Sequence, residues 1–175
     1  MYPSFFFLVL CSGGGIYRKT FLHSAPPVHI ETDGIYAVGK VASADITAAA
    51  TPALGVQAAS ATVAATAELV NAGSSAASVT VVFELFDADG NSVAKAAPAK
   101  AVAVAAAPSS AEPAMASTGP VSLAVGGGGA AVELWSVARP YLYTLVVTLD
   151  SGDSRNVSVG LCKHRRPPLS WRGAG

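Results

Sequence analysis

Residues 134–150 read LWSVARPYLYTLVVTLD, and residues 154–161 read SRNVSVGL. Apolar and polar side chains alternate through YLYTLVVTLD and through SRNVSVGL, which is the period-2 pattern of a strand with one buried face. Between them stand Ser151, Gly152 and Asp153, which are typical turn residues. The chain therefore predicts two adjacent strands here, and this pair decides the fold class.

The same alternation recurs upstream at short intervals. Residues 78–87, SVTVVFELFD, are rich in β-branched and aromatic residues, and the turn signal DADGN connects them to a second strand in NSVAKA. Further along, VSLAV and AVELW flank four glycines at residues 126–129, which we interpret as a spacer. No segment has a convincing helical period, so we predict an all-β, antiparallel sandwich and not a βαβ fold.

Two alanine-rich segments, residues 42–67 and 94–116, could be helical because alanine has the highest intrinsic helix propensity. β-Branched residues interrupt the first segment and the turn sequence NAG follows it, so we predict a strand there. In the second segment we expect a short strand within residues 100–105. A mobile loop rich in Ala and Pro should follow near residues 105–119, where bulky side chains are scarce.

The amino-terminal part carries three further signals. Residues 15–22, GIYRKTFL, alternate like a strand, and a Pro-Pro pair at residues 26–27 then interrupts the chain. Two extended pieces follow, VHIET and IYAV, separated by the tight-turn pair Asp-Gly at residues 33–34. The opening MYPSFFFLVLC, residues 1–11, is too short to span a bilayer. It leaves three interpretations open: a secretory signal peptide, a buried strand or a misplaced start codon, so localisation stays undetermined.

Composition and charge limit the classes of function. The 175 residues fit one domain, and 11 basic residues balance 11 acidic ones to a formal net charge of zero. Without a clustered basic surface, nucleic acid is not expected as a partner, and no membrane span is expected either. The two cysteines, Cys11 and Cys162, are too few for a disulfide framework; they form one bridge or remain free thiols.

No catalytic or metal site emerges from the chemically active residues. The acids lie in turns or at solvent-facing strand positions such as Glu133, and none pairs convincingly with another as acid and base. DADGN resembles a calcium loop, but glycine is fourth instead of sixth and Pro98 stands where a glutamate is needed. His23, His29 and His164 are too scattered for a zinc cluster. We therefore predict no catalytic residue, no metal and no cofactor.

Two short motifs lie near the carboxyl end. Residues 162–175, CKHRRPPLSWRGAG, have no strand or helix period, and we interpret them as a basic, disordered tail. Asn156, Val157 and Ser158 match the N-glycosylation pattern, which matters only for a secreted chain.

The segments that bracket the sandwich resemble a known family. GGGIYRKTFL is similar to the closing strand of the sugar-binding jelly roll of glycoside hydrolase family 2, the group of β-galactosidases, β-glucuronidases and β-mannosidases. LWSVARPYLYTL is similar to the family's L-W-S-x-x-x-P-Y-L-Y-x-L segment, near the end of its immunoglobulin-like domain. The resemblance covers residues 13–161. Its motif residues are Gly15, Ile16, Tyr17, Arg18, Leu134, Trp135, Ser136, Pro140, Tyr141, Leu142 and Tyr143.

The resemblance implies an immunoglobulin-like antiparallel β-sandwich of about seven strands over residues 23–161, preceded in residues 1–22 by an apolar segment and the last jelly-roll strand. It also implies that the two catalytic glutamates lie in a TIM barrel after the sandwich, and no residue here matches either motif. We therefore expect a fragment of a retaining glycosidase, inactive alone, whose partners are the jelly-roll and barrel domains. The alternative is a stand-alone sandwich that binds carbohydrate or protein.

Physical roles can be assigned within the second motif. Trp135 suits the open end of a sandwich, and Pro140 fixes the start of the next strand. Tyr141 and Tyr143 should share one strand face while Leu142 occupies the other. We interpret these as packing roles; the alternative is that Trp135 and the tyrosines form an exposed platform for sugar.

Overall fold

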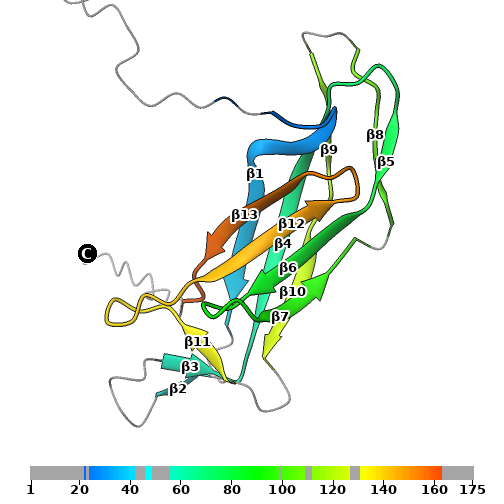
Figure 1. Cartoon of the computed structure of the whole chain (residues 1–175). Coiled ribbons are helices and arrows are strands. Elements are labelled where there is room, and N and C mark those ends of the chain that lie inside the picture. Colours follow the sequence, from blue (N-terminus) through cyan, green and yellow to red (C-terminus); the bar gives the residue numbers. More distant parts are fainter. Residues whose placement is uncertain are drawn as a thin grey trace, which may run out of the picture.

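A computed structural model describes residues 22, 24–41, 46–48, 56–98, 100–108, 112–126 and 131–162. These residues form thirteen strands and no helix, which confirms the all-β prediction (Figure 1). None of the described segments is therefore a helix that could cross a membrane. The strands are β1 (Val28–Lys40), β2 (Ile46–Ala48), β3 (Val56–Ala58), β4 (Ser60–Asn71), β5 (Ala77–Val79), β6 (Val81–Phe86), β7 (Ser92–Ala96), β8 (Val102–Val104), β9 (Ala114–Ser117), β10 (Val121–Gly126), β11 (Val132–Leu134), β12 (Tyr143–Leu149) and β13 (Ser154–Val159).

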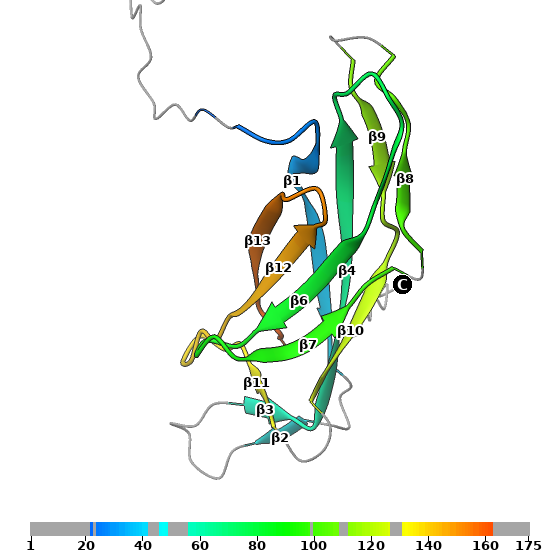
Figure 2. The ribbon, with the colours of Figure 1, turned by 45° about the vertical axis from the view of Figure 1, so that its right-hand side comes forward.

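Two four-stranded antiparallel sheets form the sandwich. In one sheet, β4 pairs with β1 along one edge and with β9 and β10 in succession along the other. The other sheet has the order β13-β12-β6-β7 (Figure 2). Immunoglobulin sandwiches divide their strands in the same way, with A, B and E in one sheet and C, F and G in the other. In that scheme β12 occupies the place of strand F.

The core lies between the inner faces of the two sheets. β4 buries every second residue from Ala61 to Leu69, and three of these five residues are alanines. Bulky side chains from the facing sheet fill the space that the alanines leave, because protein cores pack to a nearly constant density. The main ones are Phe83 and Leu85 of β6 and Leu145, Val147 and Leu149 of β12.

The two hairpins predicted from local sequence are present. β12 and β13 pair from Tyr143–Val159 to Thr148–Ser154, across the turn at residues 150–153. β6 and β7 pair across DADGN, where Gly90 has a φ of 85°. Both oxygens of Asp87 accept hydrogen bonds within that turn, so its carboxylate organises the hairpin, as the sequence predicted in preference to a calcium loop.

The prediction of two extended pieces around a tight turn at residues 33–34 is wrong. VHIET and IYAV belong to one strand, β1, because both pair with β4. The register shifts between Ile30 and Ile35, so the Asp-Gly pair forms an irregularity within the strand, where Asp33 has a φ of 59°. A bulge of this kind bends a strand and increases its twist without ending its pairing.

The described parts of the alanine-rich segments contain strands and no helix. β4 lies at the end of the first segment, and β7, β8 and β9 lie in the second. The strand expected within residues 100–105 is β8. The expected loop near residues 105–119 differs from the prediction in part, since Ala114–Ser117 form β9 and pair with the end of β4.

Two small sheets lie at opposite ends of the sandwich. Figures 1 and 2 both place the β11-β3-β2 sheet at the lower end and the β5-β8 pair at the upper end. The lower end includes the start of the loop that leads from β11 to β12. That loop contains most of the LWSVARPYLY motif and is therefore the candidate site.

Candidate functional site

The loop from β11 to β12 is held by a tight turn between Ser136 and Arg139. The backbone N–H of Ser136 donates to the carbonyl of Arg139 at 2.9 Å, and the N–H of Arg139 donates to the Ser136 carbonyl at 3.1 Å. The Ser136 hydroxyl oxygen also accepts from the Arg139 N–H at 3.1 Å. Pro140 follows this turn directly, and its fixed φ suits the start of the approach to β12.

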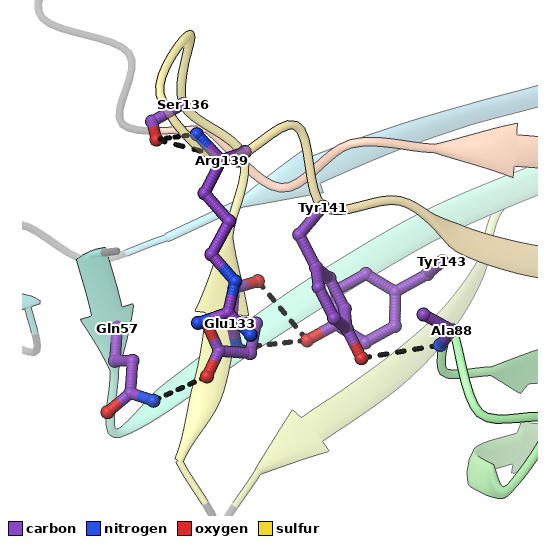
Figure 3. Close-up of polar contacts among 7 residues, drawn as sticks. All are labelled: Gln57, Ala88, Glu133, Ser136, Arg139, Tyr141 and Tyr143. Atoms are coloured by element: carbon purple, nitrogen blue, oxygen red, sulfur yellow. Dashed lines mark hydrogen bonds and ion pairs between the residues drawn. The ribbon is translucent and has the colours of Figure 1, made fainter. Parts of the chain in front are cut away.

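Tyr141 and Tyr143 lie side by side, as the alternation predicted. Their rings meet edge to face, with centroids 5.1 Å apart and planes at 68° (Figure 3). The Tyr141 hydroxyl accepts from the N–H of Ala88 at 3.3 Å, which ties the loop to the β6–β7 hairpin. The Tyr143 hydroxyl accepts from the N–H of Glu133 at 3.0 Å and donates to the Glu133 carbonyl at 3.2 Å, which ties β12 to β11.

Burial changes the acidity of Tyr143. The side chain is only 3% exposed, and this loss of solvation raises the pKa of its hydroxyl to about 12. The backbone N–H of Glu133 lowers this pKa, because a hydrogen bond from it would stabilise the Tyr143 phenolate. Desolvation is the larger effect. Tyr143 is therefore a neutral hydrogen-bonding group and not an acid–base catalyst near neutral pH.

Glu133 is the least expected member of this cluster. The sequence predicted a solvent-facing position, but its carboxylate is only 19% exposed and contacts two other side chains. Gln57 of β3 donates to one carboxylate oxygen, and the Arg139 guanidinium lies 3.4 Å from the other (Figure 3). The same guanidinium lies 5.8 Å from the centre of the Tyr141 ring, within the range of a cation–π contact.

A cavity of about 370 Å³ adjoins the cluster. It is lined by Asp87, Ser92, Val93, Val125, Gly126, Ala131, Val132, Glu133, Tyr141 and Tyr143. Two carboxylates face it, and both are engaged by neighbouring groups. Hydrogen bonds from Asn91, and then from the backbone of the turn, lower the pKa of Asp87, while Glu133 is engaged by Gln57 and Arg139. The arrangement can hold strands together, and it lacks a free acid and base.

The outer side of the loop is apolar and accessible. Val137 at the turn is 90% exposed, and Leu142 and Trp135 are 45% and 39% exposed. Trp135 is therefore partly covered, and its role in closing the end of the sandwich stays a prediction. Its side chain lies over Gly160, where an added Cβ would come within 3.6 Å of the indole. The backbone N–H of Trp135 donates to the Leu161 carbonyl at 2.7 Å.

The remaining predicted residues divide into two groups. Leu134 is buried in the core, and Pro140 and Ser136 shape the loop as described. Gly15, Ile16, Tyr17 and Arg18, together with the strand predicted over residues 15–22, lie outside the described residues. Among the described residues, no group of three or more His, Cys, Asp or Glu side chains could hold a metal ion.

These features define an immunoglobulin-like antiparallel β-sandwich whose β11–β12 loop is held by two tyrosines. Residues 44–161 match the family model of glycosyl hydrolases family 2. Because that match covers more than half of the chain, the chain belongs to this family. A search of curated protein sequences gives no significant match.

Solved structures agree with the fold. A β-glucuronidase from glycoside hydrolase family 2 is 19% identical with a TM-score of 0.56, and the alignment covers 77% of this chain and 13% of that one. A family 2 member from Bacteroides cellulosilyticus is 25% identical with a TM-score of 0.50, covering 77% and 15%. The β-glucuronidase of Bacteroides uniformis is 18% identical with a TM-score of 0.53, covering 78% and 14%. The chain thus spans about one seventh of the length of these proteins.

Proposed function

We propose that this chain is the immunoglobulin-like module of a family 2 glycosidase and that it is not catalytic by itself. In the complete enzyme it would pack between a sugar-binding jelly roll and a catalytic barrel, and the barrel would hydrolyse O-glycosyl bonds. The observation that supports this most is the size relation: the described sandwich accounts for most of this chain but for only 13–15% of the family 2 enzymes compared above.

The state of the carboxylates supports the non-catalytic part of the proposal. Glycoside hydrolysis uses two carboxyl groups that face one glycosidic bond across a cleft. In the cavity beside the loop, Glu133 is paired with Arg139, and Asp87 accepts hydrogen bonds from its own turn. Both groups hold neighbouring parts of the fold, which differs from a pair of carboxyl groups that faces a substrate.

Hydrolysis assays test this proposal directly. Purified chain should release no nitrophenol from aryl β-galactoside, β-glucuronide or β-mannoside above a blank, while circular dichroism confirms that the same sample is folded. Release that rises in proportion to protein concentration would contradict the proposal. Sequencing of the full transcript tests the module role: we expect a frame that encodes the barrel after the sandwich, and a stop codon directly after Gly175 would contradict it.

The exposed loop supports a second candidate, a sandwich that binds protein or carbohydrate. Trp135, Val137 and Leu142 present apolar surface on a loop fixed by the Ser136–Arg139 turn, and fixed apolar groups favour binding because little entropy is lost. Calorimetric titration with galactosides and mannosides distinguishes a sugar-binding sandwich from a module that does not bind sugar. A saturable heat that disappears in Trp135→Ala would favour the binding sandwich, and no heat is expected of the module.

A further inference from the structure

The sequence contains a single Asn-X-Ser/Thr tripeptide, at residues 156–158, and the structure places it on strand β13. We infer that Asn156 is an acceptor for N-linked glycosylation and that the folded sandwich carries the glycan without rearrangement. The inference concerns a part of the molecule away from the tyrosine-held loop. It does not depend on the proposed function.

The two residues that the transfer requires point outward. Along β13 the burial pattern alternates, with Asn156 and Ser158 exposed, Val157 packed against the core and Val159 buried. A glycan on Asn156 would therefore extend into solvent and displace no core side chain. A shift of one residue along the strand would instead place the acceptor in the core, because strand side chains alternate between two faces.

The position of β13 in its sheet adds to this accessibility. Within the part of the chain that the structure describes, β13 is an edge strand that pairs with β12 alone, and Asn156 lies opposite Val146 of β12. Among the described residues, the carboxamide of Asn156 takes part in no hydrogen bond or ion pair, so attachment of a sugar breaks no interaction that holds the fold.

A shallow hollow beside Asn156 provides room for the first sugar. It has a volume of about 380 Å³ and lies between β13 and the irregular part of β1, where Asp33 adopts its φ of 59°. Its lining includes Glu31, Thr32 and Asp33 together with Asn156. Hydroxyl and carboxylate groups in this lining are suited to bond sugar hydroxyls, because both accept hydrogen bonds.

The modification needs a lipid-linked oligosaccharide pyrophosphate as the co-reactant. The amide nitrogen of Asn156 attacks the anomeric carbon of the first sugar, and a new C–N bond forms. The bond between that carbon and the pyrophosphate oxygen breaks, and the lipid pyrophosphate leaves with the bonding electron pair. One amide proton is lost to solvent, and no oxidation or reduction takes place. The product is a neutral, bulky and solubilising group on the surface.

Secretion of the full chain tests the inference. Residues 1–175 are expressed in a eukaryotic cell behind a cleavable leader for the secretory pathway, and intact mass is measured before and after treatment with an N-glycan-specific amidase. We expect one glycan per chain, removed by the amidase, and complete loss of the glycan in both Asn156→Gln and Ser158→Ala. Ser154→Ala is the matched control, because Ser154 is also an exposed serine of β13 but lies outside the tripeptide.

A second measurement tests whether the fold accepts the glycan. Thermal unfolding of the glycosylated and deglycosylated proteins should give the same midpoint within the error of the measurement. A secreted, folded chain without glycan overturns the inference that Asn156 is an acceptor. A glycan that lowers the midpoint by several degrees overturns the inference that the folded sandwich carries it without rearrangement.

Discussion

The Tyr143 hydroxyl forms two hydrogen bonds with the backbone of Glu133, accepting from its N–H at 3.0 Å and donating to its carbonyl at 3.2 Å. A neighbouring strand would use the same two backbone groups in a ladder. A side chain therefore replaces a strand at the point where β11 meets the main sandwich. Immunoglobulin sandwiches have a related feature, a tyrosine near the start of strand F whose hydroxyl bonds to upstream backbone, and Tyr143 occupies the corresponding place in β12.

Tyr143→Phe should destabilise the protein by about 1–3 kcal/mol, because it leaves the N–H and carbonyl of Glu133 without their partner while the ring still fills its site. Urea unfolding followed by circular dichroism measures this loss. Tyr36→Phe is the matched control, since Tyr36 is 70% exposed, and its stability should equal that of the wild type. Equal stabilities for both variants would contradict a structural role of the Tyr143 hydroxyl.

Stability should also fall at high pH because of the same residue. Burial raises the pKa of Tyr143 to about 12 in the folded state, whereas an unfolded tyrosine titrates near 10. Between these values the unfolded chain loses a proton that the folded chain keeps, so stability is lost as pH rises, by about 1.4 kcal/mol per pH unit. The difference in unfolding free energy between wild type and Tyr143→Phe should therefore shrink from pH 9 to pH 12. A difference in unfolding free energy that stays constant over this pH range would contradict the raised pKa of Tyr143.

Sequence reasoning succeeded where the structure depends on near neighbours. The β6–β7 and β12–β13 hairpins follow from alternation and turn residues that lie next to each other in the chain. It failed for β1, because the sequence shows an Asp-Gly pair but not the strand β4, whose pairing continues past that pair. The role of Glu133 was missed for the same reason: its partners Gln57 and Arg139 come from another strand and from a loop.

Tertiary contacts also determine why residue 126 is a glycine. It belongs to a run that we interpreted as a spacer, yet it ends β10 with a φ of 82°, and an added Cβ would lie 2.7 Å from the Ala59 carbonyl oxygen. Gly90 has nearly the same φ, 85°, with no atom within 4 Å of an added Cβ. Substitution of Gly90 would therefore introduce backbone strain alone, whereas substitution of Gly126 would introduce strain and a steric clash.

Gly90→Ala should cost about 1–2 kcal/mol, from left-handed backbone strain alone. Gly126→Ala should cost more, because the Val132 side chain and the backbone at Ala59 must also shift to make room for the added Cβ. Chemical unfolding of the two variants measures the difference. If both lose the same stability, the contact with Ala59 is unimportant and the spacer interpretation of Gly126 is adequate.

Asn71, at the end of β4, is only 1% exposed. Its amide nitrogen donates to the carbonyls of Ser75 and Ala105 at 2.9 and 2.8 Å, and its oxygen accepts from the N–H of Gly73 at 2.8 Å. One side chain thus joins the turn after β4 to the segment after β8. Asn71→Ala should cost about 1–3 kcal/mol, because it removes all three hydrogen bonds that this buried side chain forms with the backbone.

Asn71→Asp distinguishes the loss of donors from the loss of packing. The carboxylate still accepts from Gly73, but it faces the Ser75 and Ala105 carbonyls without a proton to donate. The variant should therefore be less stable than Asn71→Ala at neutral pH, and it should recover part of its stability relative to wild type as acid protonates the carboxylate. Thermal unfolding of wild type and variants from pH 7 to pH 4 measures both effects, with the exposed Asn156→Ala as the control. If the difference in stability between Asn71→Asp and wild type does not change with pH, the two donated hydrogen bonds do not join the turn after β4 to the segment after β8.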